Sequence, residues 1–205
     1  MIIRFALESD SKDLWLWRND PQTRENSVDQ NEISWEDHST WFTNSLQSDA
    51  REIFIGIDDQ ANEPIGMVRF DFDVTQASSE VSINLNPGWR EKGISESLLS
   101  GAIEAFQHQR SFVLIAQIKP QNSASIKCFE NCGFALESDS SELLIFKNKQ
   151  GIIDAIERVR STNNVNWMDL MRLAFMKAPK EAGEIVGRIN EDDGKIAALL
   201  KRLGD

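Results

Sequence analysis

Two short segments, about thirty residues apart, hold the residues whose types and spacing could do chemistry. The first runs from Arg90 to Ser95 and lies between a strand-like run and a helix-like run. A sharp strand-to-helix turn leaves backbone N–H groups free at the positive end of the helix dipole, and Gly93 lets the backbone approach a ligand closely. Arg90 and Lys92 would add charge beside a phosphate. By itself the segment is equally consistent with a plain turn that carries surface cations.

The second segment runs from Asn122 to Phe134 and follows the apolar run 112–118, which we expect to be a central strand. Asn122 is the expected N-cap of a helix over 123–131. Ser125 and Phe129 stand at i and i+4, so they share one face of that helix. The order and spacing of the two segments indicate a site for a long ligand that carries a pyrophosphate.

These residues resemble the signatures of the GNAT superfamily of N-acetyltransferases, and the resemblance covers residues 1–148. The pattern [Q/R]-x-x-G-x-[G/A] is met by Arg90 and Gly93, but Ser95 replaces the final Gly or Ala. The run N-x-x-S-x-x-x-[Y/F]-x-x-x-G-F is matched by Asn122, Ser125, Phe129, Gly133 and Phe134.

The resemblance implies that acetyl-coenzyme A lies between two splayed parallel strands, here 80–86 and 112–118, and that no metal takes part. Backbone groups near Leu85 would then pair with the pantetheine arm and steady the oxyanion. The cofactor-binding residues that it implies are Leu85, Arg90, Glu91, Lys92, Gly93, Ile94, Ser95, Asn122, Ser125 and Phe129.

The chain contains no tyrosine, whereas many members of the superfamily place one at the Phe129 position to protonate the departing thiolate. A phenolic general acid is therefore impossible here. Water, the Ser125 hydroxyl or simple loss of the thiolate must serve instead.

Attack on the thioester requires a neutral amine, so a base must take its proton. Glu80, at the head of one splayed strand, is the first candidate. Asp71 and Asp73 come next, and His38 after them. The plainer interpretation of each of these residues is a solvated surface group.

Four of the six tryptophans lie in the first 41 residues, in the region that chooses the acceptor in this superfamily. The run W-R-N-D-P at 17–21 and the stretch 36–42 resemble transferases that acetylate nucleotide-linked amino sugars of the pseudaminic- and legionaminic-acid pathways. Aromatic faces can stack on a sugar or a base, and Arg18 or Arg24 could meet a diphosphate; about half of the tryptophans would instead pack the core. The expected substrate-binding residues are Trp17, Arg18, Asn19, Arg24, His38 and Trp41.

Two other functions remain open on the sequence. The same start occurs in transferases that act on protein N-termini, including the ribosomal-protein type. A degenerate domain that only binds coenzyme A, as a sensor or scaffold, would be consistent with Ser95 and with the missing tyrosine.

The hydrophobic pattern predicts a mixed α/β (α+β) domain over residues 1–148, followed by an all-helical appendage over 151–205. Strands are expected at 2–6, 52–57, 64–73, 80–86, 112–118, 134–136 and 142–147, and helices at 9–19, from Ser34 on, 94–109 and 123–131. The appendage should contain four short helices, at 151–161, 166–178, 180–189 and 193–203. We expect their apolar faces to mediate homo-oligomerisation or docking to a pathway enzyme, the alternative being an added layer on the catalytic domain.

Composition narrows the class of protein. The 205 residues are 40% hydrophobic and 27% charged, and no run reaches the roughly 18 apolar residues of a membrane span. The first residues do not resemble a signal peptide, so we expect a cytoplasmic protein. Residues 151–205 hold nine basic and nine acidic side chains, so residues 1–150 carry the whole net charge of −11. This negative charge argues against nucleic acid as a partner.

Cys128 and Cys132 are expected to be free thiols, since a metal would need further ligands.

Overall fold

The computed structural model describes the backbone of residues 1–204 and the side chains of residues 1–161, 163 and 165–197. The chain divides into two compact units, Met1–Asp154 and a second that begins at Ala155. The first unit has the mixed α/β architecture expected from the sequence. Among the described residues, no helix is both long enough and apolar enough to cross a membrane.

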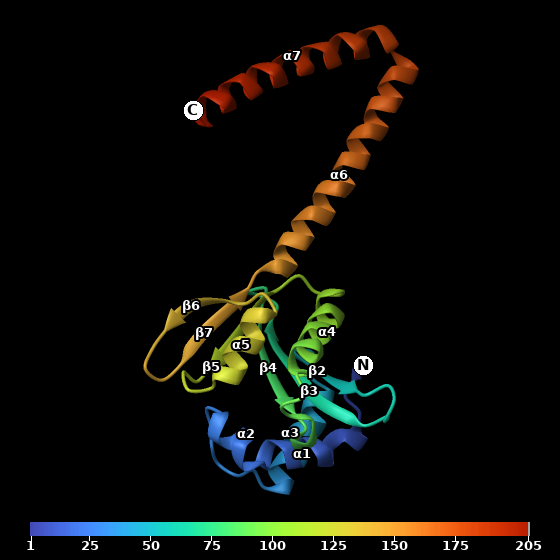
Figure 1. Cartoon of the computed structure of the whole chain (residues 1–205). Helices are drawn as coiled ribbons and strands as arrows, with labels where there is room; N and C mark the ends of the chain where they lie inside the picture. The colour runs from blue at the N-terminus through green and yellow to red at the C-terminus, as the bar shows by residue number, and fades with distance from the viewer. Residues whose placement is uncertain (205) are drawn as a thin grey trace. The chain divides into compact units, whose positions relative to one another are not determined.

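Seven strands form one sheet in the first unit (Figure 1). Its order is β1-β2-β3-β4-β5-β7-β6, and β4 pairs with β5 in parallel while the other neighbours pair antiparallel. The strands are β1 (Ile2–Phe5), β2 (Arg51–Ile57), β3 (Pro64–Asp73), β4 (Ser78–Leu85), β5 (Val113–Ile118), β6 (Ala135–Asp139) and β7 (Leu144–Asn148).

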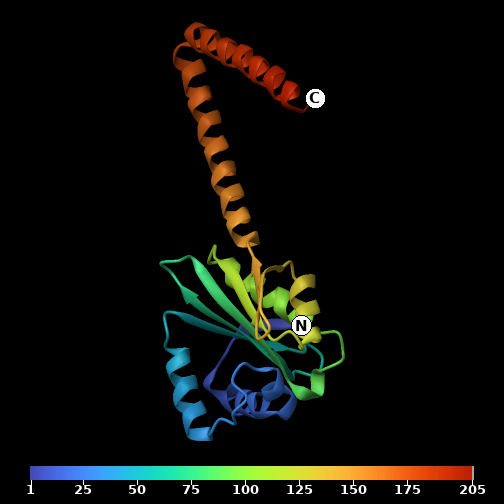
Figure 2. The same ribbon diagram turned by 90° about the vertical axis from the view of Figure 1, so that its left-hand side faces the viewer.

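Helices cover both faces of this sheet (Figure 2). One face carries α4 (Ser95–Gln107) and α5 (Ser123–Asn131). The other carries α1 (Ser11–Asn19), α2 (Pro21–Asn26) and α3 (Trp35–Leu46). Two short 3₁₀ turns, η1 (Glu8–Asp10) and η2 (Pro87–Trp89), precede α1 and α4.

Alternation along the strands produces an apolar layer on each side of the sheet. Phe70 of β3 points to the α4 side, where its ring stacks on Phe106 with 4.2 Å between centroids. Ile55 of β2 points to the opposite side and packs in a cluster with Trp17 and Phe42. The flanking helices therefore bury the apolar side chains on both faces of the sheet. Strand side chains that the helices do not cover can line a site.

The helix expected at 9–19 ends at Asn19, but the chain enters another helix at Pro21. Asp20 caps α2, since its Oδ1 accepts a hydrogen bond from the Thr23 N–H at 3.1 Å. Pro21 occupies the first helical position, where its fixed φ is favourable and its missing N–H costs nothing. This helix was absent from the sequence prediction because the proline suggested only a break.

The prediction of four short helices after residue 150 was wrong. Two long helices, α6 (Gln150–Lys177) and α7 (Pro179–Gly204), take their place. Pro179 again starts a helix, and Gly194 lies inside α7 rather than at a boundary. A glycine costs a helix interior only about 1 kcal/mol, which the neighbouring helix formers can offset.

Candidate active site

The two parallel strands pair over only three residues and then part. Ser78, Ser79 and Glu80 pair with Val113, Leu114 and Ile115, while β4 runs on to Leu85 and β5 to Ile118. A cavity of about 950 Å³ borders both strands from Glu80 onwards. The β5-facing edge of β4 beyond Glu80 therefore has no strand partner in the described part of the chain, and its backbone groups are available to a ligand.

The turn at one end of this cavity has the geometry that the signature predicts. Glu91 and Gly93 adopt the left-handed region, with φ of 61° and 68°. Helix α4 begins at Ser95, and no side chain caps its first N–H groups. Gly93, Ile94 and Ser95 border the cavity, so uncapped N–H groups lie where a phosphate could accept them. Serine at the last signature position is accommodated as the first helical residue.

Both cations of the signature have partners within the protein. The Arg90 guanidinium lies 2.6 Å from the Asp20 carboxylate and donates to Thr23 Oγ1 at 2.7 Å. Burial opposes the ionisation of Asp20, but hydrogen bonds from Arg90 and the Thr23 N–H outweigh it and hold the pKa of Asp20 below its usual range. The Lys92 ammonium lies over the Trp89 ring, 4.2 Å from its centroid. Arg90 borders the large cavity, so its expected role beside a phosphate stays a prediction, whereas Lys92 does not border this cavity.

The second signature segment forms the opposite wall. Asn122 Oδ1 accepts a hydrogen bond from the Ser125 N–H at 3.1 Å, so the predicted N-cap of α5 is confirmed. Asn122, Ser125 and Phe129 border the cavity, as does Leu85 across from them. Phe129 is buried and meets the Phe134 ring edge-on at 4.9 Å, which anchors α5 in the core.

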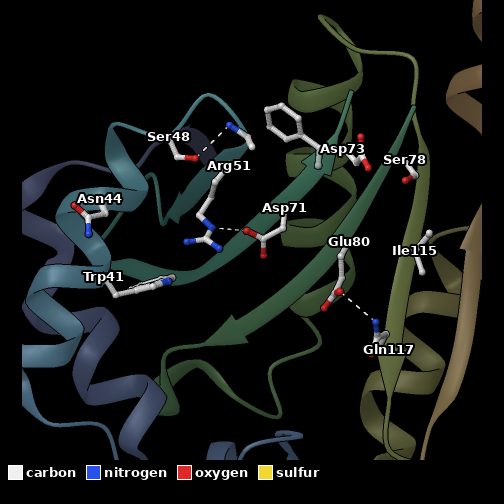
Figure 3. Close-up of a pocket in the computed structure, with 12 residues that line it drawn as sticks. Trp41, Asn44, Ser48, Arg51, Asp71, Asp73, Ser78, Glu80, Ile115 and Gln117 are labelled. Atoms are coloured by element: carbon white, nitrogen blue, oxygen red, sulfur yellow. Dashed lines mark hydrogen bonds and ion pairs between the residues drawn. The ribbon is translucent and has the colours of Figure 1, made fainter. Parts of the chain in front are cut away.

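A second, shallower cavity of about 630 Å³ continues from the first over the polar face of the sheet (Figure 3). Trp41, Glu80 and Gln117 border both cavities. Glu80 is exposed, and its Oε2 accepts a hydrogen bond of 3.2 Å from Gln117 Nε2. An exposed carboxylate thus stands at the junction of the two cavities, where β4 and β5 begin to part.

Asp71 and Asp73, the next candidates for the base, are occupied by other partners. Asp71 pairs with Arg51 (Figure 3). It also pairs with Arg69 at 2.7 Å, so two cations hold its charge. Asp73 caps a turn, and the hydrogen bonds from the Thr75 hydroxyl and N–H lower its pKa. Glu80 is therefore the carboxylate of this group that is most free to accept a proton.

His38 borders the large cavity but is buried in an aromatic stack. Its Nε2 lies 2.8 Å from the Ser11 carbonyl oxygen, which fixes this nitrogen as the donor. Burial lowers the pKa of His38, and the Ser11 contact offsets that only in part, so the ring is neutral near pH 7. His38 therefore packs in the core, and its side chain also borders the cavity in which an amine substrate could bind.

The other predicted substrate residues divide into two groups. Arg18 and Trp41 border the large cavity. Trp17 is 5% exposed and belongs to the core, so its assignment to the substrate is corrected. Asn19 is fastened to Ile33 by two hydrogen bonds of 2.8 and 2.9 Å and holds the loop before α3. Arg24 does not border the cavity.

Several cavity residues were missed by the sequence prediction. Thr23 and Asn84 hydrogen-bond to each other at 3.2 Å across the cavity, and Gln117 holds Glu80. The alternation of Ser82 and Asn84 with apolar neighbours was a signal for a polar strand face, but the partner on α2 lies 61 residues away in the sequence.

Both cysteines are free thiols beside this site. Cys128 borders the cavity, and the hydrogen bond with Cys132, together with burial, raises the pKa of Cys128 far above its usual range. A thiol that stays protonated is a poor nucleophile. The described residues contain no group of three or more side chains that could hold a metal ion.

The geometry described above agrees with the comparison with known families. The family described as Acetyltransferase (GNAT) domain matches residues 1–135. The chain therefore belongs to this family of acetyltransferases, which use acetyl-CoA, and it is an enzyme that acetylates an amine. A search of curated protein sequences finds no significant match.

Solved structures share the fold. The spermidine N-acetyltransferase from Vibrio cholerae, solved with CoA and spermine, superposes with a TM-score of 0.63 at 16% identity, over 71% of this chain and 92% of that one. The ribosomal-protein-alanine N-acetyltransferase from Brucella melitensis gives a TM-score of 0.61 at 24% identity, over 72% and 99%. An N-acetyltransferase from Staphylococcus aureus Mu50 gives a TM-score of 0.60 at 22% identity, over 72% and 96%.

Proposed function

We propose that this enzyme transfers the acetyl group of acetyl-CoA directly to the amine of a nucleotide-linked amino sugar, at the point where β4 and β5 part. The observation that carries the proposal is the position of Glu80, an exposed carboxylate at the junction of two cavities, one of which extends to the turn before α4. Acetyl-CoA and the acceptor can both reach this carboxylate from the two joined cavities.

Acetyl-CoA supplies the acetyl group as a thioester, and the residues around the larger cavity fit it. The uncapped N–H groups at the start of α4, from Ser95 on, suit the pyrophosphate. The open edge of β4 up to Leu85 suits the amide-bearing pantetheine arm. Asn122, Ser125 and Phe129 form the wall on the side of α5. Since Arg90 is held by α2, backbone N–H groups carry most of the phosphate contact.

Glu80 is the proposed general base. An ammonium acceptor gives its proton to Glu80, and the neutral nitrogen attacks the thioester carbonyl carbon. Backbone N–H groups near Leu85 stabilise the oxyanion. The new N–C bond then remains, the C–S bond breaks, and the departing thiolate takes up the second proton of the nitrogen, directly or through water. With no tyrosine in the chain, Ser125, which borders the cavity, is the proposed donor of a hydrogen bond to the departing sulfur.

Direct transfer is favoured over a covalent route because the nearest thiol is unsuited to it. Cys128 is buried and its pKa is raised, so it offers little thiolate to the thioester. The sequence of steps therefore needs acetyl-CoA and the amine to be bound together.

The nature of the acceptor is supported by the aromatic and cationic lining of the cavity. Trp41 offers a ring at the junction with Glu80, and Arg18 borders the same cavity from α1. A sugar can pack on the ring, and a phosphate can pair with the guanidinium.

A protein N-terminus is the second candidate, because a ribosomal-protein-alanine N-acetyltransferase shares the fold over 99% of its length. Spermidine, the substrate named for the Vibrio cholerae structures, is the third. A domain that binds coenzyme A without turnover is the non-enzymatic alternative.

A thiol-release assay with acetyl-CoA separates these acceptors. The panel holds a UDP-linked 4-amino-4,6-dideoxy sugar, a peptide with N-terminal Ser or Ala, and spermidine. We expect release with the sugar nucleotide alone. Release only with the peptide or only with spermidine would contradict the proposed acceptor, and binding of acetyl-CoA without release would favour the sensor.

We also propose that residues 151–205 associate with a second copy of the same segment. In α6, positions 156, 159, 163, 166, 170 and 173 recur at alternating intervals of three and four, which is the seam of a coiled coil. Ile156, Val159, Leu170 and Leu173 in this seam are each at least half exposed. Asn163 and Asn166 occupy its middle, and polar seam residues of this kind favour pairing with an identical helix in register.

A further inference from the structure

One nitrogen of the Arg18 guanidinium is buried and has no hydrogen-bond partner among the described residues. This nitrogen is Nη1, whereas Nη2 donates to the Asp29 carbonyl oxygen at 2.8 Å. Leaving such a donor unpaired is unfavourable, and more so for a charged group. The side chain borders the large cavity, so a ligand there can supply the missing acceptor.

Two more arginines surround it. Arg24 also has a buried Nε without a partner in the described part of the chain, and its nearest carboxylate, Glu32, is 4.0 Å away. Arg69 borders the cavity and pairs with Asp71. Burial lowers the pKa of Arg18, the charge of Asp29 opposes this, and repulsion from Arg24 and Arg69 adds to the lowering. Three like charges, two of them with unpaired donors, are therefore gathered in a unit that is otherwise strongly acidic.

We infer that this arginine cluster, Arg18, Arg24 and Arg69, is an anion site that binds the phosphate of the acceptor, with Arg18 making the direct contact. The inference rests on the proposed function and adds to it the side chains that recognise the acceptor through its phosphate. A phosphate offers several acceptor oxygens to a guanidinium fork and compensates the clustered charge.

The same cluster selects against polycationic acceptors. A polyamine would place further positive charge beside Arg18 and leave the buried donors unpaired. The arginine cluster therefore contributes no favourable binding free energy to such an acceptor. This separates the enzyme in specificity from the spermidine N-acetyltransferases that share its fold.

The first test is binding of UDP to the protein saturated with CoA, so that the pyrophosphate site at α4 is already filled. Calorimetry on wild type and on Arg18→Gln should show affinity weakened at least about tenfold in the variant, as loss of a charge-assisted contact requires. Lys12→Gln is the matched control, because Lys12 is an exposed cation on the same helix, and its UDP affinity should stay unchanged. Thermal unfolding checks that each variant is folded.

The second readout is kinetic. Arg18→Gln should raise KM for the UDP-linked amino sugar about tenfold or more, and leave KM for the same amino sugar without its nucleotide nearly unchanged. Absence of UDP binding to wild type, or equal effects of Arg18→Gln and Lys12→Gln, would overturn the anion site. Failure of every amine to be acetylated would instead overturn the proposed function, and the UDP titration would still decide the anion site.

Discussion

The guanidinium of Arg90 lies 2.6 Å from the carboxylate of Asp20, so the turn that precedes α4 is tied to the N-terminus of α2. Arg90 also donates to Thr23, whose hydroxyl reaches Asn84 on β4 at 3.2 Å. At the other end of α2, Lys119, which follows β5, donates to the Glu25 carbonyl oxygen at 3.0 Å. Helix α2, which has no buried residue, is thus tied by polar contacts to the segments that follow both parted strands.

From this arrangement we predict that Arg90 acts mainly on the acceptor. Arg90→Gln and Asp20→Asn should each raise KM for the acceptor about tenfold, since each removes a charge-assisted hydrogen bond, with a smaller change in KM for acetyl-CoA. The double variant should resemble either single one, because both break the same contact.

Arg110→Gln is the control, because Arg110 pairs with Glu52 and borders neither cavity. If Arg90→Gln instead raised KM for acetyl-CoA alone while Asp20→Asn had no effect, Arg90 would be a phosphate ligand and not a link to α2.

Glu80→Gln should lower kcat about 10²–10⁴-fold, the usual contribution of a general base, with KM for acetyl-CoA nearly unchanged. The variant should also lose the limb of the pH–rate profile in which activity rises as the base ionises. Asp73→Asn is the matched control, because Asp73 is a carboxylate that borders the smaller cavity but caps a turn. A Glu80→Gln enzyme with an intact pH–rate profile would exclude Glu80 as the base.

Ser125→Ala should lower kcat by roughly tenfold, as expected for loss of one hydrogen bond to the departing sulfur, and leave acetyl-CoA affinity nearly unchanged. Single-turnover rates and a separate titration with acetyl-CoA measure the two effects. An unchanged single-turnover rate would show that the thiolate leaves without help from Ser125.

Asp10 should stabilise the fold through its paired contact with Arg4. Arg4 donates to both carboxylate oxygens at 2.7 and 2.8 Å, and the Leu7 N–H adds a third bond. Burial opposes ionisation of Asp10, but these bonds outweigh it and lower its pKa. The stabilisation is therefore complete above the unfolded-state pKa of about 4 and is lost as pH falls through the lower folded-state value.

Asp10→Asn should accordingly cost about 1–3 kcal/mol in the free energy of unfolding at pH 7, and less at pH 3. Urea unfolding at the two pH values measures this. An equal cost at both would show that shape, and not the charge of Asp10, is what stabilises the site.

Truncation after residue 150 should reduce the mass in solution to that of a monomer while thiol release persists, because the active-site residues all precede the cut. Light scattering gives the mass. Replacing Asn163 with Leu should alter the oligomeric state, since a polar seam residue sets the register. A full-length chain that is already monomeric would contradict self-association.

The sequence predicted the sheet and the turn before α4 well because both depend on local patterns. Alternation at 80–86 placed Glu80 and Asn84 on one face, and the Asn122 cap needed only the three residues that follow it. Long-range partners could not be predicted in the same way. The side chain of Arg90 meets Asp20, 70 residues earlier, and periodicity on α1 does not distinguish the buried Trp17 from the cavity residue Arg18. The long helix α7 was missed because Gly194 was taken to lie near a boundary, whereas the helix tolerates it.

The central claim is direct transfer from acetyl-CoA to an amine bound at the same time beside Glu80. Initial rates measured with both substrates varied, for the UDP-linked amino sugar, test it most directly, together with the mass of the intact protein after incubation with acetyl-CoA alone. The account predicts intersecting lines, an N-acetylated product and an unmodified protein. Parallel lines with an acetylated protein would contradict it, since they are the signature of a covalent intermediate.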